Sequence, residues 1–101
     1  MASRLELHEI LCNTLGSRNV YFQPPASLKM NYDAIRYFRK NIENVYADDS
    51  VYNQHDCYEL IAIYRNSDSD ISKRLSKLPM CRFDRSYVAD NLYHDVFTIY
   101  Y

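Results

Sequence analysis

The chain has very little glycine: Gly16 is the only one among its 101 residues. Loops that bind nucleotide phosphates need several glycines at fixed spacing, because their backbone must approach the ligand closely and adopt unusual φ angles. This scarcity excludes the P-loop and dinucleotide-binding classes.

Net charge is also nearly absent, at −1 with histidine neutral. Affinity for nucleic acid comes chiefly from clustered Lys and Arg that neutralise phosphates, so a DNA-binding role is disfavoured. No apolar run approaches the roughly 20 residues that span a bilayer, and residues 1–11 lack the layout of a signal peptide. We therefore expect a soluble protein that is made in the cytoplasm and has no membrane partner.

The sequence has no spacing typical of a metal site. Its three cysteines are odd in number and far apart, which favours free thiols in a reducing compartment: Cys12, Cys57 and Cys81. Alternation puts His55 and Cys57 on one strand face, but two ligands do not make a tetrahedral zinc site. We predict that the chain binds no metal and no cofactor.

A catalytic site is not predicted either. His94 and Asp95 are successive residues of an expected strand, so their side chains point to opposite faces. No serine lies in a G-x-S-x-G elbow, and no paired carboxylates suggest a pocket for acid–base chemistry. We predict no catalytic residue and a protein that is not an enzyme.

Tyrosine, by contrast, is abundant: the chain has eleven Tyr and four Phe but no Trp. Tyrosine offers a large rigid surface with a hydrogen-bonding tip, which suits half-buried sheet faces and subunit interfaces. The length predicts a single domain over residues 1–101. A domain of this size buries only about 60 to 65% of its unfolded surface, so oligomerisation would help to stabilise it.

Two helices are predicted. The first spans residues 3–15, between a capping box formed by Ser3 and Glu6 and a C-terminal stop at Gly16. The second follows the turn-forming residues 66–70 and is ended by the next proline. Its apolar stripe has three members: Ile71, Leu75 and Leu78.

Strands are predicted by alternating or continuous apolar runs. Residues 19–23 form a short strand, and residues 32–42 alternate as a second one. Residues 43–65 read as the arms of a long hairpin that turns near residues 47–50, with a polar tip that projects and an apolar base in the core. Two more strands complete the domain, at residues 80–88 and 94–101, with a turn at 89–91.

The order α-β-β-β-α-β-β predicts an α+β fold, in which two helices lie on one face of a mainly antiparallel sheet. The last strand is apolar on both sides: Phe97 and Ile99 alternate with Val96 and Thr98. One face would meet the helices, and a neighbouring subunit could shield the other.

Two stretches carry a resemblance to a known family: RNVYFQPPASLKMNYDAIRYFRKNIENVYADDSVY, residues 18–52, and SKLPMCRFDRSYVADNLYHDVFTIYY, residues 76–101. Together they resemble the small tail terminator (tail completion, or head–tail joining) proteins of long-tailed bacteriophages, and the resemblance covers nearly the whole chain. It implies a structural virion protein of the neck, made in the cytoplasm of the bacterial host. Its partners would be itself in a hexameric ring, the tail-tube protein and the head-side connector, with DNA passing through the opening.

Opposite charges at turn and strand positions give candidate contacts for such a ring. Asp48 and Asp49 lie at the expected hairpin tip, and Arg82 and Arg85 lie on a later strand. Subunit contacts commonly need this complementarity, although such charges are also typical of a solvated surface. The full set of candidate interface residues is Tyr46, Asp48, Asp49, Tyr52, Arg82 and Arg85.

Two alternatives remain open at this point. A head-closure (stopper) protein of the same neck would be expected to form a small barrel without an amphipathic first helix. An adaptor domain outside the virus particle would stay monomeric and bind one extended peptide by sheet-edge pairing.

Overall fold

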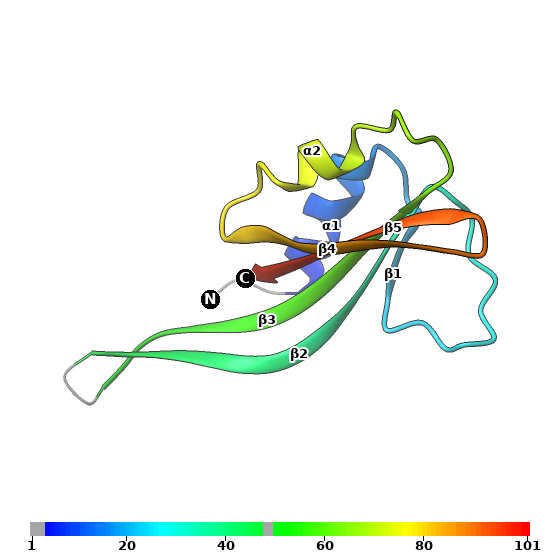
Figure 1. Ribbon diagram of the computed structural model, residues 1–101. Coiled ribbons are helices and arrows are strands. Elements are labelled where there is room, and N and C mark those ends of the chain that lie inside the picture. The colour runs from blue at the N-terminus through cyan, green and yellow to red at the C-terminus, as the bar shows by residue number, and fades with distance from the viewer. Residues whose placement is uncertain (1–3, 48–49) are drawn as a thin grey trace.

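The computed structural model describes residues 4–47 and 50–101, with the backbone alone for 41–47 and 50–55. These residues form two helices and a five-stranded sheet (Figure 1). In chain order the elements are α1 (Arg4–Leu15), β1 (Val20–Phe22), β2 (Ala34–Ala47), β3 (Ser50–Tyr64), α2 (Ile71–Leu75), β4 (Cys81–Ala89) and β5 (Leu92–Tyr100). The predicted α+β class and element order are confirmed.

The strands lie in the order β1-β2-β3-β5-β4, with β1 parallel to β2 and every other pair antiparallel. Strand β1 pairs with β2 only as far as Tyr37, and β5 pairs with β3 only from Cys57 onward. Strands β2 and β3 nevertheless stay paired with each other as far as Ala47 and Ser50. They therefore leave the sheet as a two-stranded ribbon, which gives the molecule a longest dimension of 48 Å (Figure 1).

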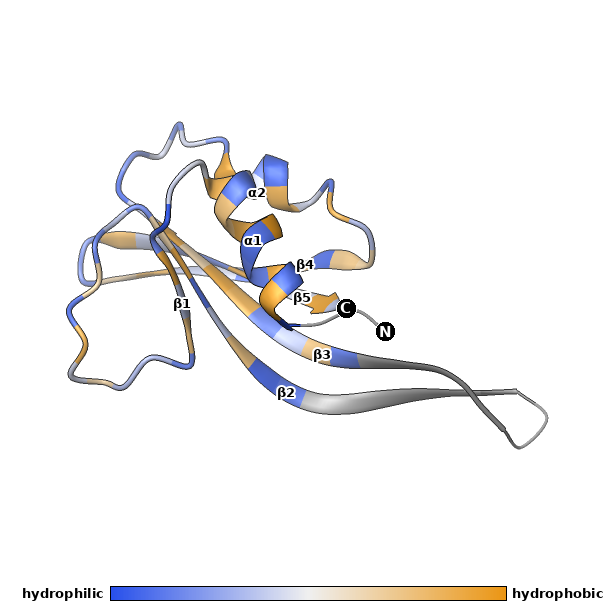
Figure 2. Ribbon diagram, turned by 180° about the vertical axis from the view of Figure 1, so that it is seen from behind, coloured by the Kyte–Doolittle hydropathy of each residue, from blue (hydrophilic) through white to orange (hydrophobic). Residues whose placement is uncertain are grey.

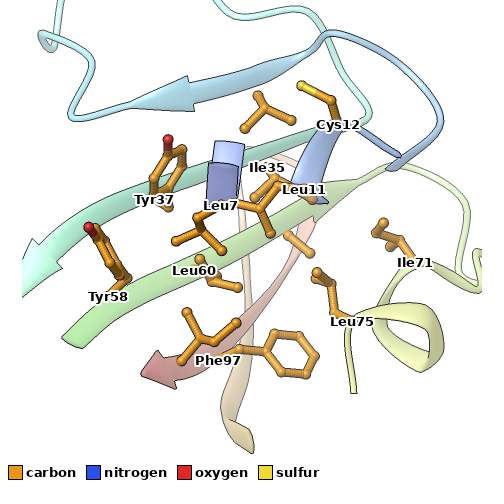
Figure 3. Packing of buried hydrophobic residues seen from close by; sticks show 13 residues of the cluster. Leu7, Leu11, Cys12, Ile35, Tyr37, Tyr58, Leu60, Ile71, Leu75 and Phe97 are labelled. Carbon is orange, nitrogen blue, oxygen red and sulfur yellow. The ribbon is translucent and has the colours of Figure 1, made fainter. Parts of the chain in front are cut away.

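Both helices cover one face of the sheet, where the main core lies (Figure 2). Leu7 and Leu11 are one helical turn apart on α1 and are both fully buried, so they form the apolar stripe of that helix. Figure 3 shows them over Leu60 of β3, with Leu75 of α2 and Phe97 of β5 completing the same cluster. This packing fixes the helices on the sheet.

Helix α1 ends as the sequence predicts. Gly16 has a φ of +86°, a left-handed conformation that costs glycine little because it has no Cβ. Its N–H donates to the carbonyl of Cys12 at 2.8 Å, which satisfies one of the free carbonyls of the last turn. Ser3, the first residue of the predicted capping box, lies outside the described residues.

Helix α2 is shorter than its sequence pattern suggests, since it covers five residues and ends at Leu75. The chain continues in tighter turns, in which Leu78 donates its N–H to the carbonyl of Leu75 at 3.0 Å. Pro79 accounts for this ending, because proline disfavours helical geometry in the residue before it. Leu78 still packs on the main core, as its place on the predicted stripe requires.

The opposite face of the sheet is covered in part by the chain itself. Ile61, Ile63 and Val96 form a second buried cluster, and Met30 and Tyr32 from the β1–β2 connection pack on it. We expected that a neighbouring subunit could shield this whole face. Its apolar part does not need that shielding, because the chain's own β1–β2 connection already packs on it. The more polar part of this face remains open.

The turn between β4 and β5 is tight. Asp90 and Asn91 have φ values of +51° and +61°, the left-handed pair that two-residue hairpin loops use. Ala89 and Leu92 therefore pair directly, and β5 begins two residues before the predicted start at residue 94. The predicted turn itself is confirmed.

Candidate interaction surface

Of the six predicted interface residues, only the two arginines have described side chains. Asp48 and Asp49 lie outside the described residues, and so do the side chains of Tyr46 and Tyr52. Arg82 and Arg85 lie on β4, an edge strand whose residues 82–88 are all exposed. The described part of the predicted interface therefore lies on β4.

A β-bulge brings the two arginines to one face of the sheet. Arg82 pairs with Thr98, whereas Arg85 pairs with Val96, so Asp84 is an extra residue in β4. Strict alternation would place two residues three positions apart on opposite faces. Because the bulge adds one residue, both arginines lie on the face of Thr98 and Val96, away from the helices.

A polar hollow of ≈ 490 Å³ lies next to Arg82 on this open part of the sheet. Thr98 and Cys57 are both buried, so they form its floor, whereas Lys40 and Arg82 are exposed at its rim. The complete lining is Lys40, Cys57, Arg82, Phe83, Asp84, Thr98 and Tyr100. Four different strands supply these residues, which explains why sequence reasoning missed Lys40.

The cations at the hollow differ in their partners. Arg85 forms an ion pair with Asp84 at 2.9 Å. Within the described part of the chain, Lys40 and Arg82 form no ion pair. Glu59 pairs with Thr98 in the sheet and brings one carboxylate to the same face, again without an ion pair among the described residues. As far as side chains are described, the rim thus presents two positive charges, those of Lys40 and Arg82, without a salt bridge.

The root of the ribbon is held by a network of polar and aromatic side chains. Arg39 lies 3.5 Å from the carboxylate of Asp56 and donates to the Tyr58 hydroxyl at 3.3 Å, and that hydroxyl donates to Asp56 at 3.2 Å. The hydrogen bond to Tyr58 raises the pKa of Arg39. These contacts join β2 to β3 at the point where the ribbon leaves the sheet.

A second network joins α1 to β2 near the same place. Arg4 donates to the Tyr37 hydroxyl at 3.2 Å, and that hydroxyl lies 2.8 Å from Nδ1 of His8. Burial and the neighbouring Arg4 lower the pKa of His8, so its ring is neutral at pH 7 and, when Nε2 carries the hydrogen, Nδ1 accepts a hydrogen bond from the Tyr37 hydroxyl. Arg4 also lies over the ring of Phe22, 4.3 Å from its centroid. The helix is thereby fixed to the base of the ribbon.

The residues weighed as catalytic candidates are engaged elsewhere. His94 stacks on Tyr87 with the ring centroids 4.7 Å apart. Asp95 is buried on the helix side, where it accepts hydrogen bonds from Ser72 and from Tyr64 at 2.8 Å. Burial, followed by the bond to Asp95, raises the pKa of Tyr64 to about 12. This arrangement ties α2 to the sheet and leaves His94 and Asp95 on opposite faces.

The cysteines show no sign of activation. Cys12 and Cys57 are buried, and burial raises the pKa of Cys81 to about 11, which keeps its thiol protonated at pH 7. Among residues 4–47 and 50–101, insofar as their side chains are described, no three His, Cys, Asp or Glu side chains gather as metal ligands. The side chain of His55 is not among those described.

An apolar groove of ≈ 280 Å³ forms a second surface, between α1 and the C-terminal end of β5. Met80, which is 57% exposed, lies at this groove. The other lining residues are Leu7, Ile10, Leu78, Pro79, Ile99, Tyr100 and Tyr101.

Comparison of the chain with protein-family models, with curated proteins and with solved structures gave no match. In the described part of the chain, neither helix has the length and apolar character needed to cross a membrane.

Proposed function

We propose that this chain is a structural subunit of a bacteriophage neck: a tail terminator that forms a six-membered ring on the last ring of the tail tube. Three features support this proposal. The element order and the placement of both helices on one face are those that the resemblance implies. The chain also extends a long ribbon from a small domain, and its open sheet face carries a polar hollow.

The ribbon formed by β2 and β3 is the observation that carries the proposal. An isolated two-stranded ribbon is only marginally stable in water, and its two outer edges leave backbone groups unpaired. Here its root is anchored by Arg39, Asp56 and Tyr58, whereas the pairing beyond them involves β2 and β3 alone. Contact with another chain would stabilise such an arm most. In a ring, the neighbouring subunit or the tail tube would make this contact.

The ring would close by head-to-tail contacts, because each subunit must join one surface to a different surface of its neighbour. The ribbon would reach the adjacent subunit or the tube, and the head-side connector would bind the other side of the ring. DNA would pass through the opening. In this proposal the chain acts by shape and contact, without a catalytic step.

Backbone amide exchange tests the role of the ribbon. Amides of residues 42–47 and 50–55 should exchange fast in the free subunit, because these parts of β2 and β3 pair only with each other. The same amides should become protected when the chain is assembled in tails. Hydrogen–deuterium exchange followed by mass spectrometry measures both states.

Residues 58–63 of β3 provide the internal control, because they pair with a strand on both sides and should be protected in both states. Strong and equal protection of the ribbon in both states would show that the free monomer already stabilises it. The proposal that this arm is an assembly contact would then fail.

The free outer edge of β4 favours one alternative, an adaptor that pairs with an extended peptide. The bulge at Asp84 and the flanking arginines oppose this use, since bulges and charges are common devices that block edge pairing. An adaptor would remain monomeric in every context. The open five-stranded sheet also lacks the closed barrel expected of a stopper.

A further inference from the structure

The geometry points to the polar hollow beside Arg82 as the place where one copy of this chain binds carboxylates from the opposite end of the next copy. This inference rests on the proposed ring function and names the two surfaces that would meet. It concerns Lys40 and Arg82 on one copy and Asp68 and Asp90 on the other.

The hollow has the chemistry of a carboxylate site. Lys40 and Arg82 lie at its rim and form no ion pair within the described part of the chain. Thr98 and Tyr100 add hydroxyl groups to its lining. The arginine guanidinium can hold a carboxylate with two parallel hydrogen bonds, and the lysine adds a second positive charge.

The opposite end of the sheet presents acidic side chains. Asp68 lies in the β3–α2 connection and Asp90 in the β4–β5 turn, and both are exposed. The ends of β3 and β5 hold these two loops at the same end of the sheet, because Tyr64 pairs with Tyr93 and their rings stack 5.4 Å apart.

The acidic groups at this end differ in whether they form an ion pair. Neither Asp68 nor Asp90 forms an ion pair among the described residues, whereas the neighbouring Asp70 is 3.1 Å from Arg74. Arg65 is the cation that follows β3, and it lies over the ring of Tyr32, 5.9 Å from its centroid. Within the described part of the chain, the carboxylates of Asp68 and Asp90 thus have no salt-bridge partner.

The two surfaces lie too far apart to meet within one molecule. Asp90 precedes β5, whereas Thr98 lies near the other end of that strand. At about 3.3 Å per residue, the strand separates them by roughly 25 Å. Two complementary surfaces at opposite ends of a subunit join copies head to tail, which is the contact that a closed ring needs.

The local charge balance favours a protein carboxylate over DNA as the occupant. Asp84 and Glu59 lie near the two cations, and Asp84 already pairs with Arg85. Nucleic-acid affinity requires many phosphates to be neutralised together, which a hollow lined by Lys40 and Arg82 as its only described cations does not offer. Lys40, Arg82 and Arg85 set against Asp84 and Glu59 leave one net positive charge, which suits the carboxylate oxygens of a protein surface better than the many phosphates of DNA.

A reciprocal charge-reversal experiment tests the inference. We expect K40E/R82E to weaken self-association of the full chain at least about tenfold, since interfacial charge pairs can contribute more than about 1.4 kcal/mol. D68K/D90K should weaken it similarly. An equimolar mixture should recover association, because the reversed hollow of one variant then meets the reversed end of the other. Sedimentation velocity measures all three samples.

K29E/K73E is the matched control, since it reverses two exposed lysines away from the hollow and changes the net charge by the same amount. It should associate as the wild type does. Raising the salt from about 0.1 M to about 1 M shortens the screening length from about 10 Å to about 3 Å and should weaken wild-type association. Circular dichroism should show the same fold for every variant.

Several results would overturn the inference. If wild-type rings form but K40E/R82E associates as well as its control, or if the mixture shows no recovery, the hollow is not the contact and the ring proposal still stands. DNA binding that K40E/R82E abolishes, with self-association unchanged, would give the hollow a different ligand. A wild-type chain that is monomeric both in solution and in purified tails would refute the ring and this inference together.

Discussion

Leu75→Ala is expected to lower the free energy of unfolding by roughly 2 to 5 kcal/mol, a large effect for a single substitution. Leu75 is fully buried in the main core and is one of two buried anchors of α2, the other being Ile71. A helix of five residues has little stability of its own, so its position depends on this packing. The substitution would leave a cavity between α2 and the sheet.

Urea unfolding followed by circular dichroism measures this change. Leu5→Ala is the matched control, because Leu5 is also helical but is 66% exposed, and its truncation should cost less than about 0.5 kcal/mol. A loss below about 1 kcal/mol for Leu75→Ala would mean that the core can collapse around the gap. The helix would then contribute less to the fold than its burial indicates.

Replacing Asp48 and Asp49 together by lysine is expected to reduce attachment of the chain to its neighbour or to the tube by about tenfold or more. This number corresponds to about 1.4 kcal/mol, which a reversed interfacial charge can supply. Both residues lie outside the described part of the structure, and their role follows from their place in the sequence between β2 and β3. Stability should change by less than about 0.5 kcal/mol, as is usual for exposed turn charges.

The double-lysine variant is best compared with D48N/D49N, which removes the charges without reversing them. The asparagine variant should have an intermediate defect in the yield of infectious tails, with normal thermal unfolding for both proteins. Normal infectious tails from the lysine variant would show that this turn is only a solvated part of the surface.

Local patterns predicted most elements of the fold. The leucine spacing and Gly16 determined α1, and the strict alternation of Phe97 and Ile99 with Val96 and Thr98 gave β5 its two buried faces. The order of elements then followed from turn-forming residues between them. Helix α2 was overestimated, because its apolar stripe continues through Leu78 after the helix has ended.

The missed features depend on contacts between distant parts of the chain. The bulge at Asp84 is a mismatch between β4 and β5, and the sequence of β4 alone does not reveal it. Lys40 and Arg82 line the same hollow only because β3 and β5 lie between their strands. Met30 and Tyr32 pack on the second buried cluster only because the β1–β2 connection runs across that face of the sheet, and the sequence does not show this path. The sequence identified Arg82 and Arg85 as candidate contacts, but it did not show that Lys40 and Arg82 line one hollow.

Electron cryomicroscopy of purified particles tests the central claim most directly. Our account predicts a ring with sixfold symmetry at the head-side end of the tail tube, into which this domain fits with its ribbon against the neighbouring subunit or the tube. Mass spectrometry of the same particles should detect the chain at six copies per tail. Particles that lack the chain, together with a strictly monomeric protein in solution, would contradict the account.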